Sequence, residues 1–167
     1  MKFKYGIDHL DLDIVNGIAN GSIQAELCQE ALDNINVSRQ RVEKMAASDK
    51  AVYGINTGFG PLCDTQITPE ETNLLQTNLL ITHAVGVGEP IAKEISKLML
   101  ITKVHALSKG FSGIRLETVE RMLAFIELDL IPVVPEQGSV GASGDLAPLS
   151  HLFLPLLGVG EFWQSNA

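Results

Sequence analysis

The sequence predicts a mainly helical fold. Apolar residues recur at three- and four-residue spacing over several long segments, which is the periodicity of amphipathic helices. Helix start and stop signals bracket these segments, and no segment makes a convincing sheet. About five helices are expected. The chain has 167 residues, 46% of them hydrophobic, which is enough for one domain around a single core.

The N-terminal elements begin with residues 1–5, a candidate short strand. Asp11 can cap a brief helix that ends at the turn signal Asn20-Gly21. A long helix is then expected from Gln24 to Ser48, with one apolar stripe and one water-facing side. The stripe comprises Cys28, Ala31, Leu32, Ile35, Val42, Met45 and Ala46, and the water-facing residues are Arg39, Arg41, Glu43 and Lys44.

Residues 51–55 are a second candidate strand, which leads into a loop over residues 56–61 that is rich in turn formers. Thr68 then supplies an N-cap, Pro69 fits the first helical turn, and Glu71 stands at the capping-box position. The sequence therefore predicts a helix that starts after Thr68. It should end near His83, because two glycines follow closely.

Two further helices are expected before residue 130. Pro90 predicts the start of one that ends at Gly110, and another should run from Arg115 to Leu128, before two prolines. The expected buried faces are Ile91, Ile95, Leu98, Met99, Thr102 and Leu107 in the first, and Leu116, Val119, Met122, Leu123 and Ile126 in the second. An apolar segment, residues 149–162, comes so late that we expect it to lack packing partners, which suggests a fragment of a longer protein.

Charge and composition exclude several classes of protein. There are 12 basic and 20 acidic residues, a net charge of −8, which disfavours binding to nucleic acid. Cys28 and Cys63 lie far apart without metal-site spacing, and no metal or nucleotide cofactor is expected. No signal peptide or membrane-spanning segment is recognisable. The expected location is the cytoplasm, with reduced thiols.

The most unusual segment runs from Gln137 to Asp145, with three glycines in seven positions. A phosphate-binding loop would end in lysine, whereas this one ends in Asp145, which would cap the next helix. A serine nucleophile elbow would need a Gly-x-Ser-x-Gly pattern, but Ser143 is followed directly by Gly144. An ordinary flexible turn also fits such a composition.

A fourth interpretation is chemistry of the backbone itself. The amide nitrogen of Gly144 would attack the carbonyl carbon of Ala142 and close a five-membered ring, since glycine lets the backbone bend into contact. Loss of one water from the ring and a second from the Ser143 side chain would leave an electrophilic methylidene-imidazolone (MIO). Asp145 could act as a local base, and the following helix would point backbone amides at the loop.

Residues 138–149 resemble the signature of the aromatic amino acid ammonia-lyase family, which includes histidine, phenylalanine and tyrosine ammonia-lyases and related aminomutases. Three other segments are similar to family stretches and occur in the same order. They are Tyr53-Gly54-Ile55-Asn56-Thr57-Gly58-Phe59-Gly60, Thr82-His83-Ala84-Val85-Gly86-Val87-Gly88 and Gly110-Phe111-Ser112-Gly113-Ile114-Arg115. The resemblance covers most of the chain from about residue 40 onward and implies the helical, aspartase/fumarase-like fold.

The resemblance implies a role for each matching residue. Ala142, Ser143 and Gly144 would form the MIO electrophile, with Asp145 beside it. Tyr53 would remove the β-proton of the substrate, which requires a site that favours phenolate. Without the resemblance, Tyr53 would be interpreted as an aromatic residue packed over the core. Gly60, in the same segment as Tyr53, would contribute to substrate binding.

His83 is the candidate specificity residue. A lone histidine at a helix end is more often a cap or a core residue, but the resemblance places His83 where the substrate side chain is recognised. Histidine enzymes have His-Ala there, tyrosine enzymes often His-Leu, and phenylalanine enzymes an apolar pair. His83-Ala84 therefore favours histidine as substrate, with urocanate and ammonia as products. His151 is interpreted as a structural residue behind the loop.

The prediction is that residues 1–167 form a single N-terminal helical domain of a longer histidine ammonia-lyase-like enzyme. Family members are tetramers whose sites combine residues from several subunits, and an arginine for the substrate carboxylate lies later in the family's sequence. This chain alone is therefore expected to be inactive or weak. The alternatives are a tyrosine or phenylalanine lyase, an aminomutase, or a non-catalytic helical module that associates through the apolar segment 149–162.

Overall fold

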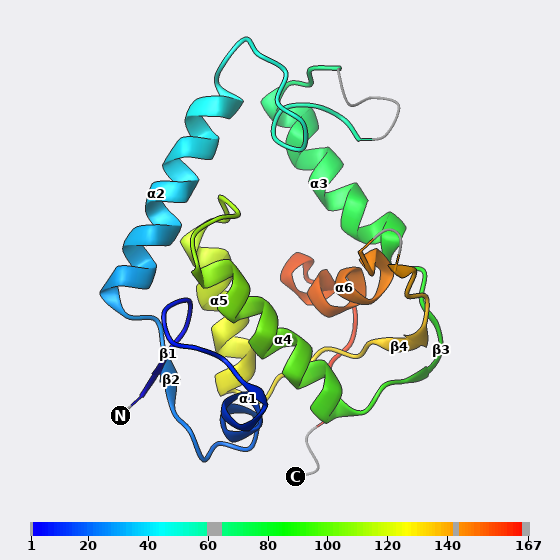
Figure 1. Cartoon of the computed structure of the whole chain (residues 1–167). Coiled ribbons are helices and arrows are strands. Elements are labelled where there is room, and N and C mark those ends of the chain that lie inside the picture. The colour runs from blue at the N-terminus through cyan, green and yellow to red at the C-terminus, as the bar shows by residue number, and fades with distance from the viewer. Residues whose placement is uncertain (1, 60–64, 142–143, 165–167) are drawn as a thin grey trace.

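The computed structural model describes residues 2–59, 65–141 and 144–164. Within these ranges the fold is mainly helical, as predicted, with two small two-stranded sheets (Figure 1). The helices are α1 (Leu12–Ala19), α2 (Gln29–Ala46), α3 (Pro69–His83), α4 (Lys93–Ser108), α5 (Leu116–Glu127), α6 (Leu146–Phe153) and the 3-10 turn η3 (Leu154–Leu157). The strands are β1 (Phe3–Lys4) parallel to β2 (Ala25–Glu26), and β3 (Val87–Pro90) antiparallel to β4 (Pro135–Gln137).

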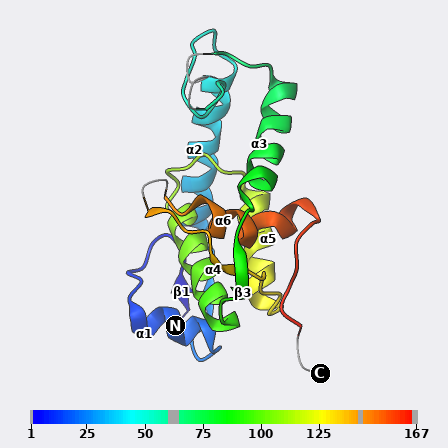
Figure 2. The same cartoon turned by 90° about the vertical axis from the view of Figure 1, so that its right-hand side faces the viewer.

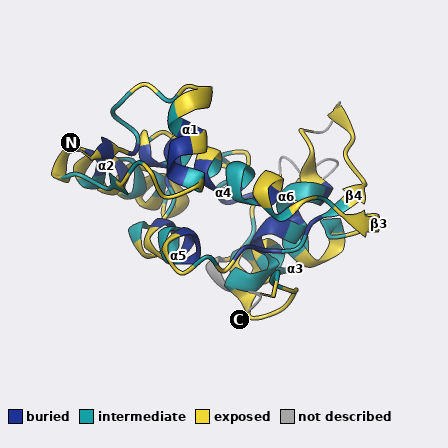
Figure 3. Cartoon of the chain, turned by 90° about the horizontal axis from the view of Figure 1, so that it is seen from below, coloured by how far each residue is buried: buried dark blue, intermediate teal, exposed yellow. Residues whose placement is uncertain are grey.

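Helix α4 lies at the centre of the core, where it packs against α1, α2 and α5 (Figure 3). Its predicted buried face is confirmed only in part: Ile91, Leu98, Met99 and Leu107 are partly buried against the core, whereas Ile95 is 48% exposed and Thr102 is exposed. The fully buried apolar residues, Leu100, Ile101 and Val104, were not predicted. Apolar residues occur on several sides of this helix, so the sequence could not determine its orientation. Packing against neighbouring helices decides it. For α5 the predicted stripe is confirmed at Val119, Met122 and Ile126.

Helices α2 and α3 extend from the core towards the same end of the molecule (Figures 1 and 2). Helix α2 starts at Gln29 rather than the predicted Gln24, because Ala25 and Glu26 pair with β1. Its apolar stripe is only half buried: Ala31 and Ile35 are in the core, whereas Met45 is 45% exposed. The C-terminal half of α2 extends beyond the core and contains no buried residue. No residue of α3 with a described side chain is buried either.

The predicted helix ends are largely confirmed. The Asp11 side chain accepts a hydrogen bond from the Ile14 amide (2.9 Å), and Thr68 and Glu71 form the reciprocal capping box of α3. Helix α3 ends at His83, as expected. The start predicted at Pro90 is wrong, because this residue belongs to β3 and α4 begins at Lys93. The candidate strand over residues 51–55 is also wrong, because residues 53–55 form a turn.

The apolar segment 149–162 does find packing partners, contrary to the prediction. Leu152 and Phe153 are buried, and the Phe162 ring packs edge-to-face on Phe125 with centroids 5.2 Å apart. The backbone amide of Trp163 donates to the Ile131 carbonyl (2.8 Å), which ties the segment to the loop after α5. Leu157 and Val159 of this segment stay exposed, at 37% and 47%, and apolar side chains are also exposed on α3, where Leu74 is 61% and Ile81 50% exposed.

Candidate active site

The glycine-rich segment connects β4 to α6 (Figure 1). Ala142 and Ser143 lie outside the described residues, as does Gly60. Gly144, at the edge of the described part of the segment, has φ +78°, and apart from its chain neighbours no described atom lies within 4 Å of the position a Cβ would take. The backbone there is left-handed, a conformation that glycine adopts more freely than other residues, and the space beside it is open.

Asp145 occupies the N-cap position of α6, but it does not cap the helix as predicted. Its backbone is left-handed, with φ 57° and ψ 42°, and its side chain makes no capping hydrogen bond. Instead, the carboxylate accepts a hydrogen bond from the Ser139 hydroxyl. This bond joins the two ends of the glycine-rich segment, so Asp145 helps to define the shape of the loop.

His83 ends α3 with its ring turned back onto the helix. Its Nδ1 lies 2.7 Å from the Leu79 carbonyl oxygen. Because a carbonyl can only accept, Nδ1 carries the proton, and Nε2 is left as the second polar atom of the ring. Nε2 makes no hydrogen bond with the described residues. The ring therefore serves as a helix cap through one nitrogen and has the other nitrogen for a further partner.

The segment after His83 lies directly beside the glycine-rich segment. Val87 pairs with Gln137 and Pro90 with Pro135 in the β3–β4 ladder, and the Gly86 amide donates to Nε2 of His151 on α6 (3.0 Å). Residues 45 to 65 positions apart in the sequence are thereby brought together at the C-terminal end of α3. The structure thus joins two of the predicted site segments.

Tyr53 lies in the turn at residues 53–55 and is 63% exposed. Its ring contacts Phe59 edge-to-face, with centroids 5.7 Å apart. The alternative interpretation of Tyr53 as a residue packed over the core is wrong, because a core aromatic would be nearly inaccessible to solvent. Tyr53 instead presents its phenol ring at the surface of this chain.

Tyr53 and the glycine-rich segment are not brought together within one chain. The loop around residues 51–59 lies by the N-terminal end of α3, while β3, β4 and α6 lie by its C-terminal end (Figure 1). Helix α3 has 15 residues, and a rise of about 1.5 Å per residue gives it a length of roughly 20 Å. Within this chain the two segments therefore lie at opposite ends of α3.

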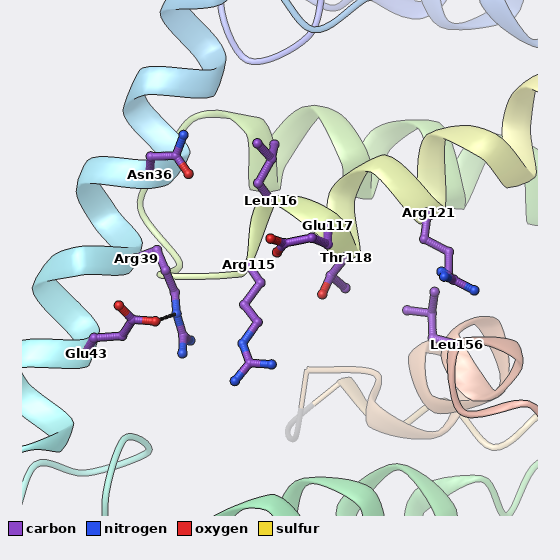
Figure 4. A pocket seen from close by; sticks show the side chains of 9 residues that line it. All are labelled: Asn36, Arg39, Glu43, Arg115, Leu116, Glu117, Thr118, Arg121 and Leu156. Carbon is purple, nitrogen blue, oxygen red and sulfur yellow. Dashed lines mark hydrogen bonds and ion pairs between the residues drawn. The ribbon is translucent and has the colours of Figure 1, made fainter.

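Two cavities in the described part of the chain lie elsewhere. One, of about 740 Å³, opens between α2 and α5 and is lined mainly by charged residues: Asn36, Arg39, Glu43, Arg115, Leu116, Glu117, Thr118, Arg121 and Leu156 (Figure 4). Its Arg39 pairs with Glu43 (2.7 Å), so part of the charge is neutralised internally. The other, of about 520 Å³, lies beside β1 and α1. Neither cavity is lined by a predicted site residue.

Comparison with known proteins shows the family of this chain. Residues 10–167 match the model of the family described as aromatic amino acid lyase. The chain belongs to this family. A histidine ammonia-lyase of Symbiobacterium thermophilum is 49% identical over 153 residues, which are 92% of this chain and 30% of that protein. The chain spans about a third or less of the relatives it matches.

Solved structures of aromatic amino acid lyases share the fold. The crystal structure of histidine ammonia-lyase from Trypanosoma cruzi matches with a TM-score of 0.88 at 38% identity, over 99% of this chain and 32% of that one. Tyrosine aminomutase from Streptomyces globisporus matches with a TM-score of 0.89 at 28% identity, over 100% of this chain and 31% of that one. The fold is thus common to proteins named for different reactions.

The sequence analysis missed one residue that organises the candidate site and gave too little weight to another. Asn56 is 3% exposed; its Oδ1 accepts from the Val52 amide (2.7 Å) and its Nδ2 donates to the Lys50 carbonyl (2.9 Å). It fixes the turn that carries Tyr53. An asparagine in a turn-rich segment is the signal that could have indicated this role. His151, interpreted as structural, contacts the segment that follows His83.

The described part of this chain also bears on metal sites and on membrane-spanning helices. No cluster of three or more His, Cys, Asp or Glu side chains there is placed to hold a metal ion. None of the helices in the described ranges has the length and apolar character needed to cross a membrane.

Proposed function

We propose that this chain is the N-terminal domain of a lyase that eliminates ammonia from L-histidine and yields urocanate. The observation that carries the proposal is the docking of the His83 segment on the glycine-rich segment, through the β3–β4 ladder and the bond from Gly86 to His151. This docking supports the proposal because His83, whose Nε2 makes no hydrogen bond with the described residues, comes three residues before Gly86 in the chain. The relatives named histidine ammonia-lyase support the same substrate.

The residues that would form MIO are Ala142, Ser143 and Gly144. The group would supply an electrophile that activates the substrate for loss of ammonia. The described flanks support this assignment, because Gly144 is left-handed and uncrowded and the Ser139–Asp145 bond closes the loop. Asp145 is proposed to hold the loop in shape, and its carboxylate is the nearest local base that the sequence offers.

His83 is proposed to recognise the imidazole of the substrate. With Nδ1 donating to the Leu79 carbonyl, Nε2 is the atom that can accept a hydrogen bond from a ligand. A substrate imidazole has a ring N–H to donate, whereas a phenyl ring has none. Gly60 is proposed to line the substrate site near Tyr53.

Tyr53 is proposed to remove the β-proton in a site completed by another subunit. Its exposed ring and its separation from the glycine-rich segment along α3 support a contribution in trans. The exposed apolar residues of α3 support the same conclusion, because Leu74 and Ile81 would be covered in an assembly. A homotetramer in the cytoplasm, acting on a free amino acid, is the proposed working form.

The decisive experiment is the intact mass of the complete enzyme combined with a substrate assay. A deficit of two waters that maps to residues 142–144, together with release of urocanate from histidine, would support the proposal. Ser143→Ala should restore the two waters and abolish deamination, while the matched control Ser22→Ala, at an exposed serine outside the segments that resemble the family, should change neither.

The same experiment separates the alternatives. Faster turnover of tyrosine or phenylalanine than of histidine would contradict the role of His83, and formation of a β-amino acid would indicate an aminomutase. An unmodified mass without activity would indicate a non-catalytic association module. Replacement of Tyr53 by Phe should lower kcat far more than it changes KM, and equal losses in both would indicate a packing role.

A further inference from the structure

Among the hydrogen bonds of the described residues, the bond between His151 and Gly86 is the one that links α6 to the segment that carries His83. Its Nε2 accepts from the Gly86 amide at 3.0 Å. Because Nε2 is the acceptor, the neutral ring must carry its proton on Nδ1. The backbone of α6 at His151 is anchored in the core, because the adjacent residues Ser150 and Leu152 are buried.

The backbone at Gly86 fits closely between two surfaces. A Cβ at this position would lie 3.0 Å from Nε2 of His151 and 3.2 Å from the Gln137 carbonyl oxygen. Directly after β4, a Cβ at Gly138 would lie 3.0 Å from the Gly86 Cα. A side chain at either glycine would require the facing atoms to move by a few tenths of an ångström. The approach of residue 86 to the imidazole therefore depends on both glycines.

The β3–β4 ladder would hold this segment only weakly by itself. All four residues of β3 are exposed, and the pairing is irregular between Val87 and Pro90. An isolated pair of short strands is marginally stable in water. The imidazole of His151 supplies a polar contact from outside the ladder, at the end nearest to His83.

Gly86 and His83 are connected by a short stretch of backbone whose conformation is fixed by hydrogen bonds. The Val85 amide donates to the His83 carbonyl (2.9 Å), which closes a tight turn between the two residues. The His83 ring is in turn fixed to Leu79. A shift of Gly86 must therefore move the backbone that carries the His83 imidazole.

We propose that His151 is a positioning residue, whose Nε2 holds the 83–86 segment against the glycine-rich segment and so sets where His83 meets the substrate. The role of His83 rests on the proposed function, whereas the hydrogen bond to Gly86 does not. His151 itself touches no substrate. Loss of its acceptor should weaken substrate binding more than it slows the chemical step.

The test compares His151→Leu, which removes the acceptor, with His151→Gln, whose side-chain oxygen can accept from the Gly86 amide. Both are made in the complete enzyme, with His9→Leu as the matched control at an exposed histidine. Hydrogen–deuterium exchange reports on the Gly86 amide, steady-state kinetics report kcat and KM for histidine, and intact mass reports the electrophile.

For His151→Leu we expect exchange at Gly86 to rise about tenfold and KM to rise about five- to tenfold, as for loss of one hydrogen bond, with kcat within about threefold and an unchanged mass. His151→Gln should recover most of both changes. The proposal is overturned if exchange at Gly86 stays at the wild-type level in the leucine variant, if glutamine fails to rescue, or if kcat falls while KM is constant. A wild-type enzyme without histidine lyase activity would reject the proposed function, while the exchange data would still decide the hydrogen bond.

Discussion

Replacement of Asn56 by alanine should release the turn that carries Tyr53. The wild-type carboxamide makes two short hydrogen bonds in a buried position, from the Val52 amide (2.7 Å) and to the Lys50 carbonyl (2.9 Å). A third, to the Ser48 carbonyl, is long at 3.4 Å, and that carbonyl also accepts from Gln66. Counting about 1 kcal/mol for each of the two short bonds gives a loss of about 2 kcal/mol.

The loss should be local, because the turn lies at the outer end of α2 and α3, away from the core (Figure 1). A change of about 2 kcal/mol corresponds to a roughly 30-fold larger open population. Hydrogen exchange at the Val52 amide should accelerate by that factor, with little change in the thermal midpoint of the domain. In the complete enzyme, kcat should fall through displacement of Tyr53.

Asn73→Ala is the matched control, because Asn73 is exposed on α3 and its side chain makes no hydrogen bond with the described residues. Unchanged exchange at Val52 in Asn56→Ala would refute the argument. Equal acceleration in the control would refute it as well, since the effect would then not come from the buried carboxamide.

Three further predictions concern the core and its charges. Leu100→Ala should lower the free energy of unfolding by about 3 kcal/mol and Ile95→Ala by less than about 1 kcal/mol, because only the former side chain is buried; urea denaturation of both variants checks which face of α4 is in the core. Burial lowers the pKa of both His105 and His151 below 6.5, so the unfolded chain takes up protons first and stability should fall as the pH drops below about 6.5; urea titrations from pH 7.5 to 5 measure this, and a flat profile would contradict it. Hydrogen bonds from Lys93 and Lys97 lower the pKa of Asp129. Asp129→Asn should therefore lower the free energy of unfolding at pH 7 by up to about 1 kcal/mol, a small amount because solvent screens the exposed carboxylate. The difference in unfolding free energy between variant and wild type should vanish as the pH falls through the lowered pKa.

Local signals in the sequence determined where most helices begin and end. The Asp11 cap, the Thr68–Glu71 capping box and the glycine after α4 each act within one helical turn, and the structure confirms all three. The stripe of α5 was predictable for a related reason, because its apolar residues occupy one face and leave a single way to bury them.

The orientation of α4 and the pairing of the strands could not be determined from local signals in the sequence. Helix α4 has apolar residues on several sides, so its neighbours selected the face with Leu100 and Ile101. The start of α2 moved because residues 25–26 found a strand partner at the N-terminus. The candidate strand near Tyr53 is a turn instead, because the buried side chain of Asn56 forms hydrogen bonds with the backbone of Lys50 and Val52.

For the candidate site, the sequence by itself identified the segments and their order through motif resemblance, including the glycine-rich segment and the one with His83. Only the tertiary structure decided which segments meet. It set Gly86 against His151, 65 residues later, and left Tyr53 at the other end of α3. The physical reason is range: a cap or a helical stripe is encoded within a few residues, whereas a contact between distant segments depends on how the whole core packs.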